Sequence, residues 1–364
     1  MIGDASEGSK YITQTKKRIK RAGISRSRVV KPGDFLLTNS MSFGHPYILK
    51  TTGCIHDGWL VLSPLKDNID PNYFYHLLTS PGVYLEFARR AAGATVKNLN
   101  IDLVKGVEIQ LPPTSEQKRI AAILDQADEL RQKREETLRV LDMLPKSSFN
   151  EMFGDPGANP KGWPITTLGA VGELERGVSK HRPRNEPSLL NGPYPLIQTG
   201  DIANCDGYIE RYVSTYSEAG LRQSRLWPRG TLCVTIAANI GKTGILCFDA
   251  CFPDSVVGFK PGNLARTEYV QWWMSFIQKR LEEEAPQFAQ KNINLAILRD
   301  LKIPIAPLKL QGEFARKVNA IYKLKSLATA HLTALEALFT SLQHRAFAGE
   351  LTAKQAEGEL EVAR

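Results

Sequence analysis

The sequence predicts an α+β protein in which two β-rich domains are joined by two long helices that form an antiparallel coiled coil. Three observations favour this architecture: a long internal repeat, short apolar runs separated by Gly and Pro in each copy, and two segments with heptad-like spacing. The length of 364 residues is typical of about two domains.

The internal repeat has a long and nearly constant period. Tyr11 returns as Tyr208, 197 residues later, and this spacing continues without a gap as far as Pro64. A second block, Lys97–Asn100, returns at 291–294 with a spacing of 194. Solenoid repeats have periods of about 20–50 residues, so this period indicates a duplicated domain instead.

Each copy is expected to run from a strand-rich region into one long helix. Apolar runs bounded by Gly and Pro predict strands at 35–38 and 231–236. Gly44 and Gly241 are interpreted as turn residues with positive φ. The next expected elements are a helix over 71–90 or 267–284 and a short strand over 107–111 or 301–305.

The last element of each copy has apolar residues spaced alternately three and four apart, which predicts a heptad seam. Its seam positions are Ile120, Ile123, Ala127, Leu130, Leu141 and Leu144 in the first copy, and Ile321, Leu324, Ala328, Leu335, Leu338 and Leu342 in the second. The alternative is that each helix packs only on its own domain. Polar mid-seam residues such as Arg134 and His331 favour pairing of the two helices, because such residues can fix register.

The ends of the first long helix carry specific signals. Thr114 and Gln117 have capping-box spacing at its start, and Pro145 is expected to bend or end it. The predicted boundaries are a first β-rich domain over 1–112, a first long helix over 113–154, a linker over 155–162, a second β-rich domain over 163–307, a second long helix over 308–351 and a tail over 352–364.

Charge and composition point to a polyanionic partner. The net charge is +9, which favours nucleic acid because Lys and Arg neutralise phosphates. No apolar run is long enough to span a bilayer, so no membrane partner is expected. The five cysteines form no C-x-x-C pair, which predicts a cytoplasmic chain without disulfides or a metal site.

Several segments, in this order, resemble the specificity subunit of type I restriction–modification systems. These are the P-P-x-x-x-Q segment within Leu111–Ala121, its looser counterpart at 307–311, Trp163-Pro164 with Leu168-Gly169, Ile197–Ile202, and Ala346–Leu351. The resemblance covers nearly the whole chain. It implies that each β-rich domain is a target-recognition domain that reads one half of a split double-stranded DNA site.

The same resemblance implies the partners and the chemistry. In that family the paired helices act as a ruler between the half-sites and dock two methyltransferase subunits, and restriction subunits join this DNA methylation complex. The chain is therefore expected to have no catalytic site. It is also expected to bind no cofactor, because S-adenosylmethionine, ATP and Mg belong to the partner subunits.

One departure from the family pattern concerns the first domain. The 45 residues from Trp163 to Gly207 have no counterpart before Tyr11, so the first domain is expected to be incomplete at its N-terminus. An alternative function is therefore a truncated or silent assembly subunit that binds a methyltransferase but reads little DNA sequence. A stand-alone nucleotide hydrolase built on 241–243 is disfavoured, because Ile236 stands where a phosphate loop needs Gly.

Candidate DNA-binding residues are basic or amide side chains expected on loops and helix tips. Some lie in the basic run before residue 30, some are shared by both copies, and some differ between the copies. The candidates are Lys16, Lys17, Arg18, Lys20, Arg21, Arg26, Arg28, His45, Arg89, Arg90 and Lys97 in the first copy, and Arg176, Lys180, His181, Arg182, Arg184, Arg225, Lys242, Gln290 and Lys291 in the second.

Overall fold

The structure, a computed structural model, describes residues 9–15, 17–39, 44–63, 68–91, 99–237, 239–284, 293–351, 358 and 360–362. Its contacts divide the chain into two compact units. Unit 1 comprises Met1–Leu138 with Leu327–Arg364, and unit 2 comprises Arg139–Ser326.

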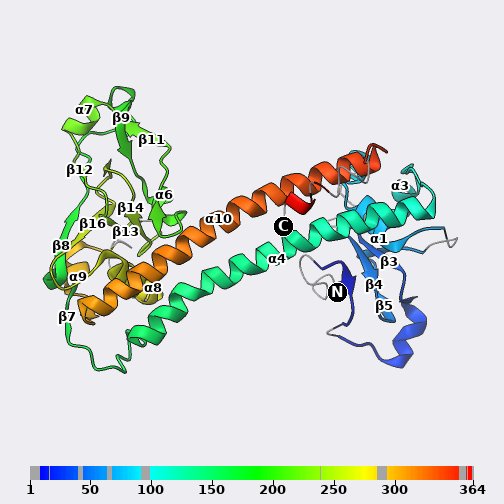
Figure 1. The fold of residues 1–364 in the computed structure, drawn as a ribbon, viewed down its shortest axis with the longest axis horizontal. Helices are drawn as coiled ribbons and strands as arrows, with labels where there is room; N and C mark the ends of the chain where they lie inside the picture. Colours follow the sequence, from blue (N-terminus) through cyan, green and yellow to red (C-terminus); the bar gives the residue numbers. More distant parts are fainter. Residues whose placement is uncertain are drawn as a thin grey trace. The chain divides into compact units, whose positions relative to one another are not determined.

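Unit 1 contains a four-stranded sheet with the order β1-β4-β3-β6 and a two-stranded sheet β2-β5. Figure 1 shows β3, β4 and α1 beside the first part of α4. The elements before α4 are β1 (Tyr11–Ile12), η2 (Arg21–Arg26), β2 (Arg28–Val30), β3 (Phe35–Thr38), β4 (Pro46–Leu49), β5 (Gly53–Ile55), β6 (Trp59–Leu62), α1 (Pro71–Leu78), α2 (Pro81–Ala91) and α3 (Ile101–Lys105).

The single helix expected over 71–90 is in fact two helices. The Asp70 side chain caps the start of α1 by accepting bonds from the Asn72 and Tyr73 amides. The chain then leaves the helix at Thr79, and α2 starts at Pro81. A proline disfavours helical backbone in the residue before it and is well suited to a first helical position, which explains the break.

Unit 2 contains a five-stranded sheet with the order β10-β14-β13-β16-β8, a four-stranded sheet β11-β9-β15-β12 and a two-stranded sheet β17-β7. Its elements between the long helices are β7 (Ile165–Thr167), α5 (Leu168–Val171), β8 (Gly172–Arg176), η3 (Pro187–Leu189), β9 (Leu190–Leu196), α6 (Thr199–Ala203), β10 (Tyr208–Ile209), β11 (Ser214–Tyr216), α7 (Glu218–Arg222), β12 (Leu226–Trp227), β13 (Leu232–Thr235), β14 (Thr243–Leu246), β15 (Ala250–Cys251), β16 (Val256–Pro261), α8 (Thr267–Glu284), α9 (Leu295–Asp300) and β17 (Lys302–Pro304).

The two units repeat the same strand pairings in the same register. Tyr11 pairs with Ile48 in parallel in unit 1, and Tyr208 pairs with Ile245 in parallel in unit 2. The antiparallel pairs β3·β4, β3·β6 and β2·β5 likewise correspond to β13·β14, β13·β16 and β12·β15. Gly44 and Gly241 have φ values of 82° and 75°, which confirms the expected turns. The sequence repeat is therefore a repeat of structure.

The short strand expected over 107–111 is not formed, because residues 107–113 have no strand assignment. Its counterpart in unit 2 is β17, which pairs with β7. Among the described residues of unit 1 no strand corresponds to β7, so residues 107–111 have no partner strand there.

The two long helices are α4 (Thr114–Phe153) and α10 (Leu308–Phe347), and each unit contains a part of both. In unit 1 the beginning of α4 packs with the end of α10, since Ile120 and Leu124 share a buried core with Leu342. In unit 2 the end of α4 packs with the beginning of α10, where Phe149 and Phe314 lie 5.4 Å apart between ring centroids. Within each unit the helices therefore pair in antiparallel order.

The seam residues differ in burial. Ile120, Ile123, Ala127, Leu141, Ala328, Leu335 and Leu342 are buried, and Leu130, Ile321 and Leu338 are half-buried. Leu144 and Leu324, in contrast, are 39% and 55% exposed, so these two assignments were wrong. At these turns the contact between the helices runs through Pro145, which is buried, and Lys325, which is partly buried and paired with Asp142.

Of the two possibilities stated for Pro145, the ending of the helix is excluded, because Pro145 lies inside α4 and the helix continues to Phe153. Gln117 is not part of a capping box, because its side chain accepts a bond from the Asp70 amide and donates to the carbonyls of Asn68 and Pro112. The buried side chain thus ties the start of α4 to the loop before α1.

The same arrangement occurs at the start of α10. Gln311 accepts from the Arg266 amide and donates to the Leu264 and Ala306 carbonyls. Each of these buried glutamines satisfies one backbone donor and two acceptors, which explains why the Pro-x-x-x-Gln spacing appears in both copies. None of the helices in the described residues is both long and apolar enough for a membrane span.

Candidate nucleic-acid interface

The densest group of predicted DNA-binding residues follows β1 in unit 1. Lys17, Arg18, Lys20, Arg21, Arg26 and Arg28 are all exposed. They lie on the connection from β1 through η2 to β2, and β2 is held by pairing with β5. No ion pair involves these six side chains among the residues described here, so their charges are available to a polyanion.

A second group of predicted residues gathers around Asp254 in unit 2. The carboxylate of Asp254 accepts from Arg182 at 3.4 Å and from Arg184, and its carbonyl accepts from Arg176 at 2.9 Å. The three arginines come from β8 and the following loop, far from Asp254 in the sequence. One carboxylate with three guanidinium groups leaves net positive charge, and Arg182 and Arg184 remain about half exposed.

A third cationic site lies beside this group, on the face of Trp227. The guanidinium of Arg225 lies 4.2 Å from the ring centroid and the ammonium of Lys260 lies 5.4 Å from it. Arg225 also pairs with Glu175 on β8. The buried indole therefore fixes two cations by cation–π contact, and Lys260 is a candidate that the sequence analysis missed.

The remaining predicted residues are dispersed. Arg89 and Arg90 both pair with Glu86 on α2, at 2.9 and 3.4 Å. His45 and Lys242 occupy matching positions in the β3–β4 and β13–β14 turns, and Lys180 and His181 are exposed after β8. Lys16, Lys97, Gln290 and Lys291 lie outside the described residues.

Each unit also has a polar cluster that fastens its strands to the long helices, and neither cluster was predicted. In unit 1, the carboxylate of Asp125 on α4 contacts Lys10 Nζ at 2.6 Å and the fully buried His76 Nε2 at 2.7 Å. Burial raises the pKa of Asp125, but the hydrogen bonds from His76 and Lys10 outweigh burial and lower it overall.

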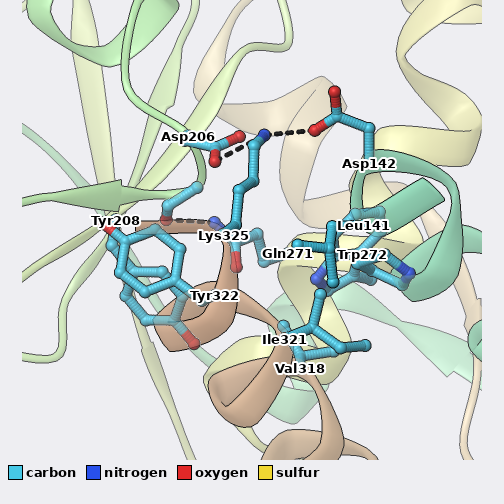
Figure 2. Close-up of a pocket in the computed structure, with 12 residues that line it drawn as sticks. Leu141, Asp142, Asp206, Tyr208, Gln271, Trp272, Val318, Ile321, Tyr322 and Lys325 are labelled. Carbon is cyan, nitrogen blue, oxygen red and sulfur yellow. Dashed lines mark hydrogen bonds and ion pairs between the residues drawn. The ribbon is translucent and has the colours of Figure 1, made fainter. Parts of the chain in front are cut away.

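In unit 2 the corresponding cluster is centred on Lys325 of α10. Figure 2 shows its ammonium between the carboxylates of Asp142 on α4 and Asp206 before β10, with Asp206 at 2.6 Å. Burial lowers the pKa of Lys325, but the hydrogen bonds to both carboxylates outweigh it and the pKa is raised. Below these charges the rings of Tyr208 and Tyr322 lie 4.5 Å apart.

The Lys325 cluster lines a pocket of about 70 Å³ whose walls are mostly apolar. Leu141, Val318 and Ile321 contribute aliphatic walls, and Gln271 donates to the Gly207 carbonyl at 2.5 Å. A cavity of this size holds a few water molecules at most. We therefore interpret it as part of the junction between strands and helices and not as a ligand site.

The described residues present exposed cations on both strand frameworks. In the parts of the chain that the structure describes, no three His, Cys, Asp or Glu side chains gather as a metal ion would require.

Comparison with known families decides the identity of this framework. The family model described as the type I restriction modification DNA specificity domain matches residues 10–139 and again residues 160–337. The two matched ranges together cover most of the chain, and they follow the boundary between the two repeats. The chain belongs to this family.

Relatives within the type I specificity family match over most of the chain. The putative type I restriction enzyme MjaX specificity subunit of Methanocaldococcus jannaschii is 22% identical over 360 residues, which cover 92% of this chain and 82% of the relative. The EcoBI specificity subunit of Escherichia coli is 24% identical over 327 residues, or 79% of this chain and 67% of the relative.

Solved structures agree on the fold of this specificity-family chain. A chain from a type I R-M system, solved in the context of complex assembly and conformational transition, aligns with a TM-score of 0.60 at 19% identity and covers 96% of this chain and 90% of its own length. The S subunit of a type I system from M. genitalium aligns with a TM-score of 0.59 at 16% identity over 93% and 88%. The mixed α+β fold with two long helices is thus confirmed.

Proposed function

We propose that this chain selects the DNA sequence for a type I restriction–modification complex by reading a bipartite duplex site, one half with each unit. The observation that carries the proposal is the recurrence of one strand framework, in one register, on two separate units. Each framework presents exposed cations, and the proposed role requires no catalytic residue on this chain.

The cationic groups suggest a division of labour in DNA binding. The Lys17–Arg28 segment has no carboxylate partners among the described residues, which suits sequence-independent phosphate contacts. The arginines around Asp254 are held in fixed positions by hydrogen bonds, which suits directed contacts with base edges. We therefore assign phosphate binding mainly to the first group and base reading mainly to the second.

The methyltransferase is proposed to dock on the exposed apolar part of the long helices in unit 2. Val140, Met143 and Leu144 follow one another at helical spacing on α4 and are 42%, 63% and 39% exposed. Leu324 on α10 is 55% exposed and adjoins Lys325, which contacts Asp142 beside Met143. Apolar groups gathered at the surface in this way mark interaction sites.

We further propose that S-adenosylmethionine, ATP and Mg are bound by the methyltransferase and restriction subunits, and that the complex acts in the cytoplasm. The docking surface is tested by co-purification with the methyltransferase. Met143→Glu combined with Leu324→Glu is expected to abolish the complex, whereas the exposed-loop control Val213→Glu leaves it intact.

DNA binding is tested by fluorescence anisotropy of a labelled duplex with the chain and its methyltransferase over a series of salt concentrations. Replacing Lys17, Arg18, Lys20 and Arg21 by Ala is expected to reduce the slope of log K against log salt by about 0.9 for each phosphate that the variant no longer neutralises. The matched control removes the same charge at Lys118, Lys133, Lys309 and Lys317, which are exposed on α4 and α10. Equal slopes for the two variants would reject the phosphate assignment.

A further inference from the structure

A groove in unit 1 runs beside residues 107–111. Two adjoining cavities of about 230 and 340 Å³ form it, and Tyr73, Gln110 and Phe347 line both of them. Apolar side chains are exposed here, with Ile109 at 39% and Leu111 at 40%. The groove therefore presents an extended backbone segment together with uncovered apolar surface.

The groove segment occupies the place that β17 occupies in unit 2. The Tyr73 hydroxyl donates to the Gln110 carbonyl at 3.2 Å, and the Tyr269 hydroxyl donates to the Pro304 carbonyl at 2.5 Å. Tyr73 and Tyr269 are repeat equivalents, and so are Gln110 and Pro304. Unit 2 can therefore be used to determine what fits against residues 107–111.

In unit 2 a strand–helix–strand segment, Pro164–Arg176, covers this place. Its first strand, β7, pairs antiparallel with β17, and the Ile305 amide donates to the Pro164 carbonyl at 2.8 Å. Leu168 and Val171 of α5 are then buried in the core. Its second strand, β8, continues the large sheet by pairing antiparallel with β16.

In unit 1 the described residues leave both receiving edges without such a segment. Among its described residues, nothing pairs with 107–111, and β6, the counterpart of β16, ends its sheet. The Leu111 amide, the counterpart of the Ile305 amide, has no backbone acceptor among the residues that the structure describes. Ile109 is 39% exposed, whereas its counterpart Ile303 is fully buried.

We propose that this groove and the outer edge of β6 together form a docking surface for a strand–helix–strand segment of a second polypeptide. The segment resembles Pro164–Arg176: a strand antiparallel to 108–110, two aliphatic side chains three residues apart, a glycine, and a strand antiparallel to β6. Strand addition to an open edge supplies main-chain hydrogen bonds, and the two aliphatic side chains supply apolar burial.

The glycine requirement follows from the close approach of the two chains. At Gly172 an added Cβ would lie 2.4 Å from the Lys260 carbonyl oxygen. The position equivalent to Lys260 is Ser63, which follows β6 directly, so a docked segment meets the same backbone there. This inference goes beyond DNA recognition and does not depend on it.

The probe is a synthetic fluorescein-labelled peptide with the sequence of residues 162–177, titrated with the full chain and followed by anisotropy. Saturable binding is expected, together with hydrogen-exchange protection at 59–62 and 107–112. A peptide carrying Leu168→Asp and Val171→Asp is expected to bind at least tenfold more weakly. Because the substitutions are in the peptide, this comparison does not depend on the folding of any protein variant.

The matched protein variants place the binding site. Ile109→Lys is expected to weaken binding of the unmodified peptide at least tenfold, whereas Leu85→Lys, an exposed position on α2 outside the groove, leaves it unchanged. Absence of binding would overturn the proposal. Hydrogen-exchange protection only at 256–261 and 302–305 would also overturn it, because the peptide would then have replaced its own segment in unit 2. Binding only after removal of residues 1–8 would overturn it as well, because the chain would then fill its own groove.

Discussion

The two units share a strand framework but are fastened to the long helices in different ways. In unit 1 the strand side supplies a cation, Lys10, and α4 supplies the anion Asp125. In unit 2 the strand side supplies an anion, Asp206, and α10 supplies the cation Lys325. The strand register is therefore the same in both units, whereas the ion pair between the strands and the long helices has the opposite polarity in the two units.

The apolar part of the junction also differs between the units. In unit 2 Phe149 packs against Phe153, Tyr269 and Phe314, with ring centroids 4.9–5.5 Å apart. The equivalent of Phe149 in unit 1 is Gln343, which is buried and whose Nε2 lies 3.5 Å from the carbonyl oxygen of His76. Unit 2 is therefore held mainly by aromatic packing and unit 1 by a larger share of polar contacts.

The largest expected effect is on this aromatic cluster. Phe149→Ala is expected to lower the free energy of unfolding of unit 2 by about 3–5 kcal/mol, because the fully buried ring leaves a cavity. Gln343→Ala in unit 1 is expected to cost about 1–2 kcal/mol, since it removes weak hydrogen bonds. Hydrogen exchange resolved by unit measures both, with the exposed Met143→Ala as the control. Similar losses in the two units would contradict the contrast.

The second largest effect is expected at Gln117 and Gln311, the buried glutamines near the start of each long helix. Gln117→Leu and Gln311→Leu are each expected to cost about 2–3 kcal/mol, because each change leaves one backbone amide and two carbonyls without their glutamine partner. Since the three bonds are the same, the two losses should agree within about 1 kcal/mol. Urea denaturation checks this, and a near-zero loss at either position would break the equivalence of the units.

A smaller effect is expected on the pH dependence of stability that arises from the Asp125 cluster in unit 1. The folded-state pKa of Asp125 is lowered from its ordinary value of 3.8, so its contribution is present above that value and is lost as the pH falls through the lowered pKa. We expect Asp125→Asn to cost about 1 kcal/mol at pH 6, because the carboxylate is partly exposed. The difference from the unsubstituted chain should vanish in acid, and an undiminished difference there would refute the assignment.

The smallest effect is expected for the Lys325 cluster in unit 2, whose contribution to stability is lost at high pH and not at low pH. The folded-state pKa of Lys325 is raised from its ordinary value of 10.5, so its contribution is present below that value and is lost as the pH rises through the raised pKa. Lys325→Met is expected to cost under about 1 kcal/mol, because the methionine retains packing in the pocket. Thermal unfolding between pH 7 and 11 should show a constant cost below pH 10.5 that begins to shrink above it, and a cost that shrinks well below that pH would count against the assignment.

The sequence predicted the repeated framework because its signals are local or periodic. Gly44 and Gly241 mark the same turn, and the spacing of 197 residues reproduces the strand register. The position of Pro81 was a local signal of the helix break that the apolar spacing concealed. The heptad pattern failed at Leu144 and Leu324, because the ion pair beside them depends on which side chains face each other across two helices.

The candidate site was harder to predict because it depends on contacts between distant segments. Nothing near Arg182 or Arg184 in the sequence indicates that Asp254 will hold them. Lys260 was missed since only the fold places it over Trp227. His76 and Asp125 were missed for the same reason, since 49 residues separate them.

The central claim, that each unit reads one half of a split DNA site, is tested most directly by selecting bound duplexes from a random library with the chain and its methyltransferase. If each unit reads one half-site, the selected duplexes will contain two short specified blocks separated by a spacer of constant length and free sequence, and Arg182→Ala with Arg184→Ala will relax only one block. A single continuous motif, no motif, or relaxation of both blocks together would contradict it.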